Sequence, residues 1–213
     1  MVFEDRADAG KLLAAAIKRL NLRNKVVLGL ARGGVVAAAE IAKVLKIPLE
    51  VVVFKKLGAP GNSELAIGAV GSHSQPYLDQ ELISQLQVTK EYLTGEIKRQ
   101  RREAARRERL YRGKRKMINI KNKNVVLVDD GIATGATMLA AVAAIKKLKP
   151  KSLILAVPVA PPSSLVKLAP QVNRVLVLHQ DENFRAVGQF FRRFEQVEDE
   201  QVIKMLDKNL RKD

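Results

Sequence analysis

A run of apolar residues that ends in two adjacent carboxylates constrains this chain more than any other feature. Residues 125–128 read Val-Val-Leu-Val, Asp129 and Asp130 follow, and small residues and threonines continue to Thr137. Apolar residues then recur at helical spacing over 138–148, which predicts a buried strand, a tight loop and a helix N-terminus. The backbone N–H groups at such a helix start stabilise an anion. The run therefore predicts a phosphate-binding loop beside two acidic side chains.

Small residues let a phosphate come close to the loop backbone, and threonine hydroxyls add hydrogen-bond donors. Asp129 and Asp130, at the carboxyl end of the strand, would accept hydrogen bonds from hydroxyls beside that phosphate. A phosphate next to vicinal hydroxyls is a ribose 5-phosphate. The alternative is a strand that ends in solvated carboxylates before an ordinary helix cap. The predicted contacts of the phosphate are Ala133, Thr134, Gly135, Ala136 and Thr137.

Residues 125–137 resemble the phosphoribosyl diphosphate (PRPP) signature of the type I phosphoribosyltransferases, which is a hydrophobic strand, an acidic pair, two variable residues and a phosphate loop. The chain departs from this pattern at Gly131, where many members carry a larger aliphatic residue. The resemblance implies transfer of ribose 5-phosphate from Mg-PRPP to a purine- or pyrimidine-like nitrogenous base, with release of pyrophosphate. It also implies that Asp129 and Asp130 are catalytic and that Mg²⁺ is the cofactor, held mainly by PRPP.

Other phosphate-binding motifs fit less well. A P-loop requires a lysine after its second glycine and a wider spacing than residues 131–135 provide. Residues 29–34 read Gly-Leu-Ala-Arg-Gly-Gly, which is not the dinucleotide fingerprint. The strand that ends in Asp-Asp resembles a Walker B element, but no Walker A element accompanies it. The sequence therefore disfavours nucleotide hydrolysis.

Strand-like and helix-like segments alternate along the chain, beginning with an amphipathic helix over 12–20 that we expect Asp8 to start. Such alternation predicts βαβ units and an α/β fold, with a parallel sheet flanked by helices. We expect a single phosphoribosyltransferase domain over residues 1–213, with ligands beyond the carboxyl ends of the strands. The predicted strands are 25–30, 49–54, 124–128, 152–157 and 174–178, and the further predicted helices are 36–45, 138–148, 162–168 and 199–210.

Residues 31–34, Ala-Arg-Gly-Gly, form a second loop at the end of a predicted strand. Glycines allow an anion to approach closely, and an arginine offers a forked set of donors suited to phosphate. The resemblance implies that Arg32, Gly33 and Gly34 bind pyrophosphate, in a loop that often holds a non-proline cis peptide. The alternative is a glycine-bearing helix start with a surface arginine.

A third strand end leads into Lys55 and Lys56 and then into a stretch rich in Gly, Pro and Asn, residues 58–62. Type I phosphoribosyltransferases carry a mobile catalytic loop here. The resemblance thus implies that Lys55 or Lys56 is catalytic and neutralises departing pyrophosphate. Residues 58–62 would be the tip of a lid that excludes water. The alternative is a plain hairpin with solvated lysines, in which residues 65–70 return as the second arm.

A basic helical insertion is predicted over residues 71–123. It contains a helical stretch at 79–86 and a long helix from a Thr89 cap to about Tyr111. Residues 96–116 include eleven Lys or Arg and three Glu, so they carry +8 of the net charge of +16. This segment is an exposed salt-bridged helix, a contact within a homo-oligomer, or a nucleic-acid-binding face. The last would suit a PRPP-sensing nucleic-acid-binding regulator, which is the alternative to an enzyme.

A small C-terminal hood and a closing helix are predicted over residues 179–213. In these transferases the hood selects the acceptor, so the resemblance implies that Phe184 stacks on the acceptor base. Three further phenylalanines, Phe190, Phe191 and Phe194, are expected to pack the hood's own core, which residues 3–6 join.

Composition sets outer limits. The chain has no cysteine, which excludes disulfides and thiol nucleophiles, and nothing places His73 and His179 together, so no protein metal ligand is assigned. No apolar run is long enough to span a bilayer, so we expect a cytoplasmic protein without a membrane partner. Its expected ligands are PRPP and an unidentified base. The motifs together resemble a bacterial group of phosphoribosyltransferases whose acceptor is unassigned.

Overall fold

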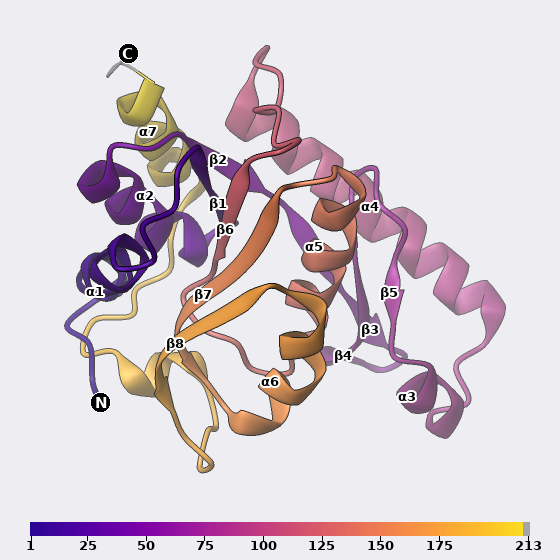
Figure 1. Ribbon diagram of the computed structural model, residues 1–213. Coiled ribbons are helices and arrows are strands. Elements are labelled where there is room, and N and C mark those ends of the chain that lie inside the picture. Colours follow the sequence, from indigo (N-terminus) through magenta and orange to yellow (C-terminus); the bar gives the residue numbers. More distant parts are fainter. Residues whose placement is uncertain (211–213) are drawn as a thin grey trace.

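Five parallel strands make up the central sheet, in the spatial order β2-β1-β6-β7-β8 (Figure 1). Every neighbouring pair in this sheet is parallel, so the predicted α/β fold with a parallel sheet is confirmed. The computed structural model of the chain describes residues 1–210. The strands are β1 (Lys25–Leu30), β2 (Leu49–Val52), β6 (Asn124–Val128), β7 (Ser152–Ala160) and β8 (Arg174–Gln180).

Helices cover both faces of this sheet (Figure 1). Side chains alternate between the faces along a strand. In β6, Val126 and Val128 belong to one core cluster, whereas Val125 and Leu127 belong to the other. Burial on both faces explains why the strands read as continuous apolar runs. Helices α1 (Arg6–Lys18), α2 (Gly33–Leu45) and α7 (Asp199–Leu210) lie on the first face, and α5 (Ala136–Lys147) and α6 (Pro162–Leu168) on the second.

Some predicted boundaries are wrong by a few residues. Helix α1 begins before Asp8, because Asp5 has an extended backbone and acts as the N-cap, accepting the N–H of Asp8 at 2.9 Å. Asp8 therefore lies within the first turn. Strand β2 ends at Val52, because the chain leaves the central sheet there and Phe54 opens a second sheet. Strands β7 and β8 run past their predicted ends because they continue to pair with each other.

The second sheet is antiparallel and contains β3 (Phe54–Ala59), β4 (Asn62–Gly71) and β5 (Tyr77–Leu78) in that order. Strands β3 and β4 form a hairpin whose register shifts on both sides of Gly58. Its turn contains Gly61 with φ 72°, a conformation that glycine adopts readily. The segment that carries the two lysines is thus an ordered hairpin, and residues 65–70 belong to its second arm.

The basic segment contains α3 (Gln80–Gln85) and α4 (Lys90–Arg112), with Thr89 as the N-cap of α4, as predicted. Along α4, Ile97 packs against the core of the second sheet, whereas Ala104 and Tyr111 pack in the central core. The helix therefore joins the two sheets (Figure 1). No helix within residues 1–210, α4 included, is long and apolar enough to cross a membrane.

Aromatic side chains form the core of the hood, around the short helix η2 (Val187–Phe190). Phe190 and Phe191 are buried as predicted, and Phe3 joins them through a parallel bridge to Phe191. Phe194 stacks on Phe191 with ring centres 5.0 Å apart. Residues 191–198, here called the strap, then cross from the hood to α7. A second short helix, η1 (Ala169–Gln171), follows α6.

Candidate active site

Three of the predicted loops meet in one open cleft at the carboxyl ends of β1 and β6. This main cleft has a volume of about 430 Å³. The glycine loop after β1, the acidic pair after β6 and the hairpin of the second sheet all face it. The predicted residues on its wall are Arg32, Gly33, Lys55, Lys56, Asp129, Asp130 and Thr137, and the additional ones are Leu30, Ala31, Phe54, Ser63, Glu64 and Gln100.

The two carboxylates of the acidic pair have different surroundings. The Asp130 carboxylate accepts a hydrogen bond from Arg6, with Nε 2.6 Å from Oδ2, and both side chains are largely buried. The Asp129 carboxylate accepts the backbone N–H of Asp130 at 2.9 Å. Burial raises the pKa of Asp129 well above its ordinary value, and the charge of Asp130 raises this pKa further. Asp130 is thus paired with a cation, whereas Asp129 keeps its proton to a higher pH than an ordinary aspartate does.

The loop after the acidic pair leaves a helix N-terminus open. Gly135 has a left-handed backbone with φ 81°, and α5 starts directly after it without a side-chain cap. Ser164 of α6 donates to the Ala133 carbonyl, and the N–H of Ile132 donates to the Val159 carbonyl at 2.9 Å, so neighbouring segments hold the loop. The backbone N–H groups in the first turn of α5 are therefore available to an anion.

The glycine loop passes directly against the acidic pair. Its Ala31–Arg32 peptide is cis, the form that the resemblance implies. A Cβ on Gly34 would lie 2.7 Å from Asp129 Cα, and a Cβ on Gly33 would overlap the Asp130 carboxylate. Helix α2 starts here without a side-chain cap, so a second open helix N-terminus lies beside the acidic pair.

The Arg32 guanidinium is engaged by acidic side chains near the C-terminus. Its Nη1 donates to Glu198 of the strap at 3.3 Å and lies 3.9 Å from Asp199 at the start of α7. Asp199 also accepts the hydroxyl of Tyr111 at 2.5 Å. The glycine loop is thereby connected to the strap, α7 and α4, and the Arg32 charge is partly neutralised.

Lys55 and Lys56 both contribute to the cleft wall, but their surroundings differ. Lys56 is exposed, whereas Lys55 is half-buried. Burial lowers the pKa of Lys55, and the positive charge of Arg107 lowers it further, while Glu103 acts in the opposite direction. Lys55 therefore gives up its proton more readily than an ordinary lysine.

The hairpin that carries these lysines is fastened to α4 at Gly58. The Tyr92 hydroxyl donates to the Gly58 carbonyl at 3.0 Å, and the buried Glu96 carboxylate accepts the Gly58 N–H at 3.4 Å. Gln100 donates to Glu96 at 2.9 Å and also reaches the main cleft. Helix α4 therefore supports the hairpin and supplies part of the cleft wall.

Comparison with known proteins identifies the family of this chain. Residues 4–190 match the family model described as "Phosphoribosyl transferase domain". The chain belongs to the phosphoribosyltransferase family. It is 42% identical to TT1426 from Thermus thermophilus, for which a crystal structure is known. The superposition of the two structures has a TM-score of 0.82 and covers 98% of this chain and 99% of TT1426. AQ2163 from Aquifex aeolicus, 16% identical with a TM-score of 0.52 over 86% of this chain and 78% of that chain, shares the fold alone.

Two curated proteins of Mycobacterium tuberculosis, MT0597 and Rv0571c, are each 38% identical to this chain over 207 residues. Their names assign phosphoribosyl transferase activity provisionally and state no acceptor. The match covers 97% of this chain but 47% of each relative, so the chain spans about half of their length.

The predicted phosphate-loop and acceptor residues of the chain differ in their access to the main cleft. Thr137 lies on the cleft wall, and Thr134 is exposed together with Ala133. Gly135 and Ala136 are buried, so they would contact a phosphate through their backbone groups and not through side chains. Phe184 is not on the cleft wall, because it stacks on Phe190 in the hood with ring centres 5.4 Å apart. Its contact with an acceptor stays a prediction.

Arg6 and Gln100 reach the site although no local pattern points to them. Arg6 contacts a carboxylate 124 positions away in the chain, and Gln100 lies within a basic helix. The one available signal for Arg6 is the expectation that residues 3–6 join the hood.

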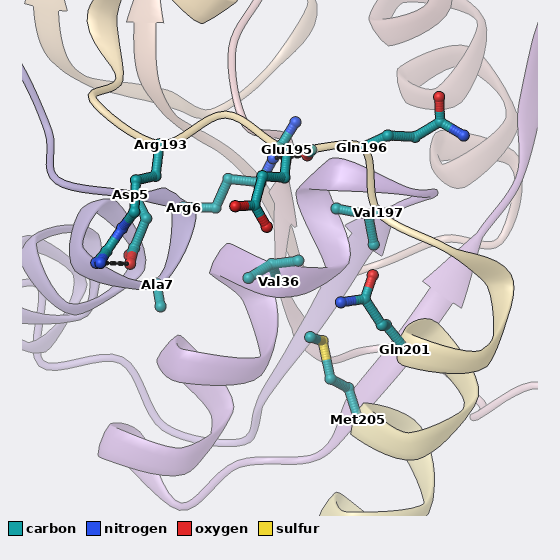
Figure 2. Close-up of a pocket in the computed structure, with 10 residues that line it drawn as sticks. All are labelled: Asp5, Arg6, Ala7, Val36, Arg193, Glu195, Gln196, Val197, Gln201 and Met205. Carbon is teal, nitrogen blue, oxygen red and sulfur yellow. Dashed lines mark hydrogen bonds and ion pairs between the residues drawn. The ribbon is translucent and has the colours of Figure 1, made fainter.

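Arg6 also borders a second, open pocket of about 260 Å³, which is lined by α1, α2, α7 and the strap (Figure 2). Figure 2 shows Arg6 extending from the start of α1 toward Glu195, while Asp5 pairs with Arg193 at 3.0 Å. Arg6 is therefore in contact with both this pocket and the acidic pair. The apolar part of the pocket wall is Val36, Val197 and Met205.

Proposed function

We propose that this protein is an enzyme that transfers ribose 5-phosphate from Mg-PRPP to a nitrogenous base and releases pyrophosphate. The strongest support is the pair of uncapped helix N-termini, those of α2 and α5, which open beside one acidic pair. PRPP carries phosphate groups at two positions of one ribose, and helix N-termini stabilise such anions. Membership of the phosphoribosyltransferase family supports the same activity.

Each group of PRPP has a proposed partner. The 5-phosphate binds the backbone and hydroxyls of residues 133–137, and the ribose hydroxyls donate to Asp129 and Asp130. Pyrophosphate binds the glycine loop and is neutralised by Lys55 or Lys56, both of which lie on the cleft wall. Arg32 would join it by exchanging its acidic partners for a phosphate oxygen.

Mg²⁺ is proposed to enter with the substrate. Within residues 1–210, no group of three or more His, Cys, Asp or Glu side chains is arranged to hold a metal. Mg²⁺ takes octahedral oxygen coordination and keeps several waters, so substrate oxygens beside the two carboxylates fit its chemistry. When bound, the ion would offset the negative charge of pyrophosphate.

The reaction breaks the bond between ribose C1 and a pyrophosphate oxygen, and the electron pair leaves with pyrophosphate. Positive charge grows at C1, where the acidic pair stabilises it. A nitrogen lone pair of the acceptor base then forms the new bond. We propose that the base approaches from the hood side, where Phe184 would stack on it. The chain acts by positioning and by preorganised charge, without a covalent intermediate.

Calorimetric titration with Mg-PRPP tests this function. We expect the wild-type protein to bind PRPP, and Asp130→Asn and Asp129→Asn/Asp130→Asn to weaken binding at least about tenfold while the fold stays intact. Asp207→Asn, at an exposed position of α7, is the control for loss of one carboxylate. A wild-type protein that gives neither heat nor a shift in melting temperature would refute the donor assignment. Pyrophosphate release with a panel of purine- and pyrimidine-like bases would then identify the acceptor.

A PRPP-sensing regulator that binds nucleic acid is the second candidate. Lys98, Arg102 and Arg109 are exposed on α4, and no carboxylate within residues 1–210 pairs with them, so they are available to phosphates. Most other arginines of the segment support the fold instead. Those engaged in ion pairs are Arg99, Arg106, Arg107, Arg112 and Arg115.

Salt-titrated binding to duplex and single-stranded oligonucleotides tests the regulator. Phosphate contacts make the affinity fall steeply with salt, and replacing Lys98, Arg102 and Arg109 by Gln should flatten that dependence. Absence of binding at low salt would exclude this candidate and leave the enzyme unaffected.

A further inference from the structure

The side chain of Arg6 is held in one orientation by three contacts. Its Nε donates to Asp130 at 2.6 Å, and its Nη1 donates to the Glu195 carbonyl of the strap at 2.7 Å. Its Cζ lies 3.7 Å from the centre of the Phe194 ring, so the aromatic face supports the cation. The side chain is 11% exposed, which leaves it little freedom to move elsewhere.

This guanidinium lies beside the glycine loop. A Cβ on Gly33 would be 3.0 Å from Arg6 Nε, so the cation adjoins the backbone that is proposed to bind pyrophosphate. The Arg32 guanidinium, which the sequence points to for that role, pairs instead with Glu198 at 3.3 Å. The guanidinium that contacts Asp130 beside Gly33 is therefore supplied by the N-terminal segment.

Arg6 still has donors to offer. A guanidinium carries five N–H groups in a planar fork, and it can bind a carboxylate and a phosphate at the same time. Nη2 of Arg6 has no acceptor within residues 1–210, although its atoms are not sealed from solvent. A phosphate oxygen on the glycine loop could take up these donors without breaking the contact with Asp130.

We propose that Arg6 is a pyrophosphate-binding residue of the donor site. Resting on the proposed function, this assigns Arg6 to the phosphoanhydride oxygens of PRPP and to free pyrophosphate. Because negative charge on pyrophosphate grows as the C1–O bond breaks, a fixed cation at this position favours departure of the leaving group. Arg6 would thus contact both Asp130, which is proposed to accept hydrogen bonds from the ribose hydroxyls, and the pyrophosphate on the glycine loop.

A purely structural role is the competing explanation, in which Arg6 only fastens the strap to the acidic pair. The two roles differ in which part of the substrate loses affinity. A pyrophosphate contact affects pyrophosphate but not ribose 5-phosphate, whose phosphate is proposed to bind the loop before α5. A structural role affects both ligands or neither.

The test is calorimetric titration of wild type, Arg6→Gln and Arg193→Gln with Mg-pyrophosphate and with ribose 5-phosphate. Arg193 is the matched control, because it lines the second pocket as Arg6 does but pairs with Glu4 and Asp5 instead of Asp130. We expect Arg6→Gln to weaken pyrophosphate binding at least about tenfold and ribose 5-phosphate binding less than about threefold. Arg193→Gln should bind both like wild type.

Equal loss of both ligands in Arg6→Gln, or unchanged pyrophosphate binding, would overturn the assignment. If Arg6→Gln does not fold, Arg6→Lys replaces it, because lysine keeps the charge but lacks the fork. This variant should bind pyrophosphate about three- to tenfold more weakly, and wild-type affinity would again overturn the assignment. Wild-type protein that fails to bind PRPP refutes the proposed function itself, whereas PRPP binding that is unchanged in Arg6→Gln refutes the role of Arg6 alone.

Discussion

Val187 of the hood packs directly on Gly131 of the signature loop: a Cβ placed on this glycine would lie 2.6 Å from Val187 Cγ1 and 3.0 Å from Val159 Cγ1. This relationship explains why the chain departs from the family pattern at position 131. The space that a larger aliphatic side chain would occupy is filled by Val187 from the hood. Gly131 does not have a positive φ, so the restriction comes from packing and not from the backbone.

We therefore predict that Gly131→Val destabilises the protein by about 1–3 kcal/mol, because it overpacks the contact with Val187. Combining it with Val187→Ala should recover part of this loss, since the two side chains share one space. Urea unfolding measures both effects. Gly95→Ala is the control, because open space surrounds Gly95 on α4 and alanine is the better helix former. Full stability of Gly131→Val would contradict the packing explanation.

A second prediction concerns Asp129 and pH. Its pKa is raised in the folded protein by burial and by Asp130, so the folded state binds the proton more tightly than the unfolded chain does. The stability that follows from this tighter proton binding is fully present below pH 3.8, the ordinary pKa of the group. It is lost as the pH rises through the raised pKa of Asp129 in the folded protein. Asp129→Asn cannot ionise, so its melting temperature should exceed that of wild type increasingly as the pH is raised above about 4. A difference that stays constant as the pH is raised would refute the raised pKa.

Local patterns were sufficient to predict most of the main cleft. Ligand loops of a parallel sheet lie at the carboxyl ends of its strands, so recognising the strands before Arg32 and Asp129 also places the residues after them. The cap at Thr89 is equally local, because its side chain accepts the N–H of Tyr92, three residues ahead. Such features depend on neighbours along the chain, and the sequence shows them directly.

The remaining parts of the site depend on contacts between distant segments. Arg6 meets Asp130 across 124 positions and Arg32 meets Glu198 across 166. The first pair forms because the start of α1 lies beside the residues after β6, and the second because the strap passes Arg32; no spacing or composition encodes either contact. Asp5 and Asp8 show a smaller failure of the same kind, since either could cap a helix and only the backbone conformation selects Asp5.

The third prediction tests the attachment of the lysine hairpin to α4. Tyr92→Phe removes the hydroxyl that donates to the Gly58 carbonyl at 3.0 Å, which should cost about 1 kcal/mol. Amide hydrogen exchange in β3 should become faster because the hairpin loses one of its two bonds to α4. Tyr77→Phe is the control, since the Tyr77 hydroxyl has no hydrogen bond within residues 1–210. Equal exchange rates in β3 of both variants would mean that Glu96 and apolar packing hold the hairpin without Tyr92.

The fourth prediction is that Glu198→Gln strengthens pyrophosphate binding. Glu198 competes with a phosphate oxygen for the positive charge of Arg32, and it is the nearer of the two acidic partners at 3.3 Å. The Glu198 side chain is 55% exposed, so the pair contributes at most about 1 kcal/mol and the gain should not exceed about fivefold. Because the competition is electrostatic, the gain should shrink as salt is added.

Glu200→Gln separates this competition from a general change in charge. Glu200 is also acidic and exposed at the start of α7, but no cation pairs with it within residues 1–210. Titration with Mg-pyrophosphate should therefore show tighter binding in Glu198→Gln and little change in Glu200→Gln. Arg32→Gln should weaken binding in both the wild-type and the Glu198→Gln background and abolish the difference between them, because the gain acts through this arginine. A gain that persists without Arg32 would show that Glu198 acts on the anion directly, by repulsion across the main cleft.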